Sequence, residues 1–79
     1  MNLWNYRVIR QLIGSDDDQV VWLAVYEVHY TDGVPTLCSE RPIELGGESL
    51  EELRVEMELF QKALQLPVLD MEIFEKKTS

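Results

Sequence analysis

The stretch that decides the fold is QVVWLAVYEVHYTDGV, residues 19–34. Its first part is rich in aromatic and β-branched side chains, which favour a β-strand from Gln19 to Tyr30. The Asp32-Gly33 pair that follows is a preferred sequence for a two-residue type I′ turn. The stretch therefore predicts a long strand that leads into a β-hairpin.

Two more strands are expected, one on each side of this stretch. Residues 4–13 have the same strand-forming composition and are followed by a cluster of turn formers, GSDDD, at residues 14–18. Residues 36–45 follow the hairpin, with Pro35 at their start and Pro42 inside them. Because proline cannot donate to a ladder, this third strand should be at a sheet edge or carry a bulge. The result is a three-stranded antiparallel meander.

A helix should follow the meander over residues 50–66. Ser49 and Glu52 have the spacing of a capping box, and Pro67 ends the helix because the residue before a proline avoids the helical region. The tail, residues 68–75, is apolar enough that we expect it to dock. The fold class is thus α+β, with the order βββα, in a single domain spanning residues 1–79.

The expected helix has more apolar surface than one sheet can cover. One stripe should face the sheet, and it consists of Leu50, Leu53, Met57, Phe60 and Leu64. A second stripe lies roughly 135° around the cylinder and consists of Val55, Leu59, Ala63 and Leu66. Either the tail or a second subunit should bury this second stripe.

The expected sheet also has more apolar surface than the helix can cover. In the register that the turn lengths suggest, the helix-covered face carries Val20, Trp22, Ala24, Tyr26, Val28 and Tyr30, with Trp4, Tyr6, Val8, Leu37, Ile43 and Leu45. The reverse face has an apolar half made of Ile9, Ile13, Val21, Leu23 and Val25. A solvated face would alternate more cleanly, so the apolar half should contact the tail or another subunit. The candidate interface is therefore Val55, Leu59, Ala63 and Leu66 of the helix with Ile9, Val21, Leu23 and Val25 of the sheet.

One polar group on the sheet has residue types that could carry chemistry. The expected register places Glu27 opposite Cys38, with His29 and Glu40 one diagonal step away. A thiolate nucleophile with a histidine base needs such proximity, but nearby carboxylates raise the pKa of a thiol, and zinc needs more Cys or His ligands than one of each. We therefore expect no catalytic, cofactor-binding or metal-binding residues. A small-ligand binder or minor enzyme using Glu27, His29 and Cys38 is one alternative.

Charge and size restrict the function further. Fifteen acidic residues against seven Lys and Arg leave a net charge of −8, which disfavours nucleic acid as a partner. The longest apolar run, Val20 to Tyr26, is too short for the ~20 residues that span a bilayer. The single cysteine, Cys38, cannot form an internal disulfide, and no secretory signal pattern is present. A small core is most simply stabilised by oligomerisation, so we expect a soluble, cytoplasmic, non-enzymatic homodimer that works in protein–protein contacts.

Several segments resemble a family of small uncharacterised bacterial proteins. They are WNYRVI (4–9), YEVHY (26–30), GESLEEL (47–53) and ALQLPVLD (63–70). This resemblance implies a cytoplasmic stand-alone domain and does not imply any particular biochemical activity. The strand-rich half followed by GESLEEL is also similar to HicB-like antitoxins, which bind a small RNA-cleaving toxin. That similarity implies a small basic protein as an alternative partner, which a charge of −8 would suit.

Overall fold

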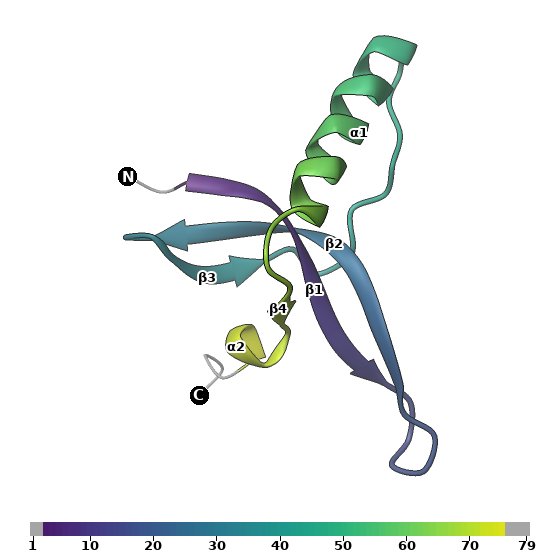
Figure 1. Cartoon of the computed structure of the whole chain (residues 1–79), viewed down its shortest axis with the longest axis vertical. Helices are drawn as coiled ribbons and strands as arrows, with labels where there is room; N and C mark the ends of the chain where they lie inside the picture. The colour runs from purple at the N-terminus through teal and green to yellow at the C-terminus, as the bar shows by residue number, and fades with distance from the viewer. Residues whose placement is uncertain (1–2, 76–79) are drawn as a thin grey trace.

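The computed structural model describes residues 3–75 and has a mixed α+β architecture. Its sheet has the strand order β3-β2-β1-β4, and a single long helix stands on one face of it (Figure 1). The elements are β1 (Leu3–Ile13), β2 (Val20–Thr31), β3 (Val34–Cys38), α1 (Leu50–Leu64), β4 (Leu69–Asp70) and α2 (Glu72–Glu75). The meander followed by a helix is confirmed, but the sheet has a fourth strand and is mixed, because β4 runs parallel to β1.

The hairpin of β2 and β3 forms where the sequence predicts it. Asp32 and Gly33 both have positive φ, at 52° and 81°, as a type I′ turn requires. β3 is an edge strand, and it also carries a bulge, since His29 pairs with Leu37 while Tyr30 pairs with Pro35. Both features expected from the prolines are thus present.

The expected end of the third strand at residue 45 is wrong, because β3 ends at Cys38. The chain still follows β2 beyond that point, where the amides of Ser39 and Ile43 donate to the carbonyls of Glu27 and Val25, at 2.9 and 2.8 Å. Pro42 has no amide to contribute to a regular ladder. The segment therefore remains alongside the sheet without forming a strand.

The expected register between the first two strands is also wrong. Ile13 pairs with Val20, so the loop holds six residues, one more than the turn-forming cluster. A one-residue change in a hairpin loop turns every side chain of one strand to the opposite face relative to its partner. Tyr6 and Val8 consequently share a face with Val25, and not with Tyr26 and Val28.

The helix covers the face that contains Tyr6, Val8 and Val25, which we call the helix face. The prediction is therefore confirmed for Tyr6 and Val8 of β1 and wrong for β2, whose Tyr26 and Val28 were expected under the helix. The helix begins as expected, since Ser49 Oγ accepts from the amide of Glu52 at 3.2 Å, while the Glu52 carboxylate accepts from the amide of Glu48, also at 3.2 Å. Its C-terminal half lies near the sheet and its N-terminal end leans away (Figure 1).

The prediction of which α1 side chains face the sheet is wrong in part. Leu50 and Leu64 are 63% and 69% exposed, whereas Ala63 of the second stripe is fully buried. Leu59 and Phe60 pack beside Ala63 against the helix face. The side of the helix that faces the sheet thus lies between the two apolar stripes.

The tail covers the opposite face of the sheet, which we call the tail face and which contains Ile9, Tyr26 and Val28. Leu69, Met71 and Phe74 pack on these residues. β4 is attached to β1 by the amide of Met71, which donates to the carbonyl of Arg10 at 2.9 Å. The alternative in which the tail folds over the second helical stripe is therefore wrong.

Candidate interaction surfaces

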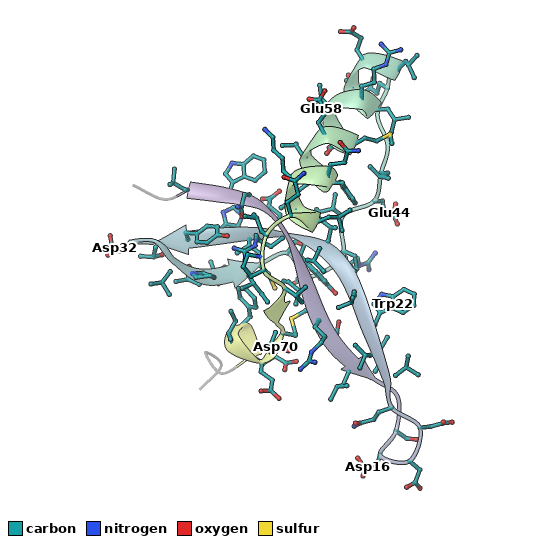
Figure 2. The ribbon with its side chains drawn as sticks, viewed as in Figure 1. Asp16, Trp22, Asp32, Glu44, Glu58 and Asp70 are labelled. Atoms are coloured by element: carbon teal, nitrogen blue, oxygen red, sulfur yellow. The ribbon has the colours of Figure 1, made fainter. Side chains whose placement is uncertain are left out.

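The distal part of the β1–β2 hairpin projects from the rest of the molecule, on the side opposite to α1 (Figure 1). We call residues 10–23 the hairpin arm. Six of its apolar side chains are between 44% and 57% exposed, and they are Leu12, Ile13, Val20, Val21, Trp22 and Leu23. Figure 2 shows Trp22 pointing away from the ribbon and Asp16 at the tip of the arm.

Both faces of the hairpin arm are apolar. The pairing places Leu12, Val21 and Leu23 on the continuation of the helix face, and Ile13, Val20 and Trp22 on the continuation of the tail face. Within residues 3–75, β1 pairs with β4 only at Ile9 and Arg10, and β2 pairs with β3 only from Val28 onward. Beyond Arg10 the arm is thus a two-stranded ribbon, a structure that is only marginally stable in water by itself.

The eight residues predicted as an interface divide into two groups. Ile9, Val25 and Ala63 are buried in the core of the chain itself, and Leu59 is partly buried beside them. Val55, Leu66, Val21 and Leu23 are exposed. The prediction is therefore wrong for Ile9, Val25 and Ala63, because the chain's own helix and tail cover these residues, whereas Leu59 stays partly exposed.

The polar residues predicted to lie together around Cys38 are on opposite faces of the sheet. His29 Nε2 lies 2.8 Å from Glu27 Oε1 on the helix face. The bulge places Cys38 opposite Val28, on the tail face, where its Sγ lies 4.0 Å from the sulfur of Met71. Burial, and secondarily the negative charge of Glu75, raise the pKa of the Cys38 thiol. The histidine and the thiol therefore do not form the pair that nucleophilic catalysis needs.

The remaining member of that group, Glu40, is an exposed residue beyond the end of β3. In the part of the chain that the structure describes, no three His, Cys, Asp or Glu side chains lie close enough together to hold a metal ion.

A groove that the sequence analysis did not predict separates α1 from the N-terminal half of β1. It encloses about 440 Å³, and its lining residues are Trp4, Tyr6, Gly46, Glu51, Glu52, Val55, Glu56 and Leu59. We call it the acidic groove. A second hollow of about 400 Å³ shares Tyr6 and Leu59 with it and extends to Leu66. In the sequence, Glu52 and Glu56 interrupt the second apolar stripe, and this is the one local signal that points to an acidic lining.

Tyr6 joins the two walls of the acidic groove. Its hydroxyl donates to Glu56 Oε2 at 2.9 Å, and its ring packs edge to face on Phe60 with the ring centroids 5.6 Å apart. Burial, the hydrogen bond to Glu56 and the charges of Glu56 and Glu27 raise the pKa of Tyr6 to about 12. Tyr6 therefore remains a neutral hydrogen-bond donor across the physiological pH range.

Comparison of the chain with protein-family models, with curated proteins and with solved structures found no match. Within residues 3–75, no helix has the length and apolar character needed to cross a bilayer.

Proposed function

We propose that this protein is a non-enzymatic interaction module that forms a homodimer through its hairpin arm. The observation that carries the proposal is the set of six half-exposed apolar side chains on both faces of the arm. Monomeric proteins rarely expose contiguous apolar patches larger than a few hundred Å². A second copy of the arm would bury part of this apolar surface and add a strand neighbour to one of the unpaired edges of the arm.

The expected affinity is moderate. Full burial of a large apolar side chain stabilises by about 1.5–3 kcal/mol, so half-exposed side chains would contribute about 1 kcal/mol each. Six such contributions are similar in size to the cost of association, which is about 4–15 kcal/mol. Backbone hydrogen bonds between arm edges would contribute about 0.5–1.5 kcal/mol each. Because these opposing contributions are similar in size, we expect a reversible dimer whose dissociation can be followed by dilution through the micromolar range.

The charge at the tip of the arm favours one arrangement of the two arms. Asp16, Asp17 and Asp18 form the tip, and two arms aligned tip to tip would place all their carboxylates together. An antiparallel pair around a two-fold axis keeps the tips apart and joins like surfaces. We therefore expect the two arms to run in opposite directions.

The test is the oligomeric state of the full chain, measured by sedimentation velocity over a range of micromolar concentrations. Val21→Lys and Trp22→Lys change side chains that are already exposed in the monomer, so the fold should persist. We expect either variant to weaken the dimer at least tenfold, which corresponds to about 1.4 kcal/mol.

Val34→Lys is the matched control, because Val34 is 57% exposed but lies in β3, outside the arm. The control should dimerise like the unmodified chain. A monomeric unmodified chain at micromolar concentration would contradict the proposal, and so would a dimer that the arm variants leave intact.

A further inference from the structure

The lining of the acidic groove combines apolar side chains with carboxylates. Its apolar part consists of Trp4, Val55 and Leu59, of which Trp4 is 52% exposed and Val55 is 57% exposed. Its charged lining residues are Glu51, Glu52 and Glu56, and no Lys or Arg lines it. Apolar contact and positive charge are thus the two properties that an occupant needs.

The carboxylates of the acidic groove have no cationic partner in residues 3–75. Glu56 accepts from the Tyr6 hydroxyl, and Glu52 accepts from the amide of Glu48, both of which are neutral donors. The carboxylate of Glu51 makes no hydrogen bond or ion pair with the described residues. A cation that enters the groove would therefore not have to displace an existing ion pair.

The aromatic residues offer a second way to bind a cation. The ring centroids of Trp4 and Tyr6 lie 5.8 Å apart, with 44° between the ring planes. Lys and Arg side chains are attracted to the face of a tryptophan ring, and their aliphatic stems pack on apolar surface. A half-exposed tryptophan beside three glutamates therefore suits a lysine or arginine side chain.

The length of the groove favours a peptide segment over a small cation. The neighbouring hollow shares Tyr6 and Leu59 with the acidic groove, so the depression continues along α1. Lys62 lines this hollow, so the negative charge is confined to the acidic groove itself. Val55 and Leu59 of α1, and Leu66 just beyond its C-terminal end, provide apolar contacts along this depression. Such a row can accommodate an extended or helical segment with repeated apolar side chains.

We infer that the acidic groove binds a basic, amphipathic segment of a different protein. A second copy of this chain is a poor occupant, because its net charge is −8 and its exposed arm has three aspartates at the tip. The groove and the hairpin arm share no residue. α1, which forms one wall of the groove, and the arm lie on opposite sides of the molecule (Figure 1). The inference therefore does not rest on the homodimer.

The experiment uses the full chain and a synthetic helix-forming peptide of lysine and leucine, with the leucines on one face. Binding is measured by calorimetry. It is also followed by fluorescence in a Trp22→Phe background, where Trp4 is the only remaining tryptophan. We expect saturable one-to-one binding that weakens about fivefold in Trp4→Ala and about fivefold in Glu51→Lys. Peptides with glutamate in place of lysine should not bind.

Asp16→Lys is the matched control for Glu51→Lys. It changes the net charge of the chain by the same amount, but Asp16 lies at the tip of the arm, far from α1 (Figure 2). Binding to this variant should remain within about twofold of the unmodified chain. Equal loss in both charge variants would show nonspecific attraction and overturn the inference.

Three other outcomes would also overturn it. The first is that the lysine–leucine peptide does not bind. The second is that free lysine or tetramethylammonium binds as tightly as the peptide, which would identify the groove as a small-cation site. The third is that Trp4→Ala changes the sedimentation of the protein alone, which would assign the groove to self-association.

Discussion

Arg7 Nη2 donates a hydrogen bond to the main-chain carbonyl oxygen of Pro67, 2.7 Å away. Arg7 lies in β1 and is only 9% exposed, and Pro67 lies where the chain leaves α1 and passes to the tail face. A second donor of the same guanidinium, Nη1, lies 2.7 Å from the hydroxyl of Tyr30. The buried arginine thus connects the central strand to the segment that leads into β4.

Replacing Arg7 should therefore loosen the tail. Arg7→Leu preserves the apolar packing of the Arg7 stem but removes the guanidinium. The Pro67 carbonyl then lacks its hydrogen-bond donor, which should lower the free energy of unfolding by about 1–3 kcal/mol. We expect faster hydrogen exchange at the amides of Met71, Phe74 and Glu75, with little change in the amides of α1. Arg10→Leu removes the exposed ion pair with Asp70 and should cost only about 0–1 kcal/mol. Equal effects of the two variants would contradict this role of Arg7.

Truncation of isoleucines along β1 should locate the end of the core. Ile9 is fully buried, so Ile9→Ala should lower the free energy of unfolding by about 2–5 kcal/mol. Ile13 is 44% exposed in the arm, so Ile13→Ala should cost less than about 1 kcal/mol in the monomer. Urea denaturation of dilute protein measures both values. A similar loss in the two variants would mean that the arm is already buried.

High pH should destabilise the fold through Tyr6. The pKa of Tyr6 is raised from 10.0 to about 12, so the folded chain holds this proton more tightly than the unfolded chain. The resulting stabilisation is fully present below pH 10 and is lost as the pH rises to about 12. Tyr6→Phe should remove this part of the pH dependence, as measured by urea denaturation at a series of alkaline pH values. An unchanged slope in the variant would show that another group is responsible.

Salt should affect the two proposed surfaces in opposite directions. Each subunit carries a net charge of −8, so electrostatic repulsion opposes dimerisation, and screening should strengthen the dimer as salt rises. Binding of the lysine–leucine peptide joins opposite charges and should weaken over the same range. Sedimentation and calorimetry at about 0.01 M and about 0.5 M sodium chloride, between which the screening length changes roughly sevenfold, test both trends. A dimer that weakens with salt would contradict apolar association through the arm.

The local features of the fold were predictable because each depends on a few neighbouring residues. The Asp32-Gly33 turn, the serine cap at Ser49 and the edge position of β3 follow from backbone preferences that act within one turn. The excess of apolar surface was also evident from the sequence. The location of this exposed apolar surface was not evident, because it depends on which surfaces the helix and the tail cover in the folded chain.

The tertiary structure decided which face each strand presents. One extra residue in the first loop and the bulge opposite His29 reversed the pairing of faces, which separated Cys38 from His29 and placed the helix over Val25. It also sent the tail to the face opposite α1 and left the hairpin arm uncovered. Side chains alternate with a period of two along a strand, so a shift of one residue reverses the outcome, and a composition pattern cannot detect that shift.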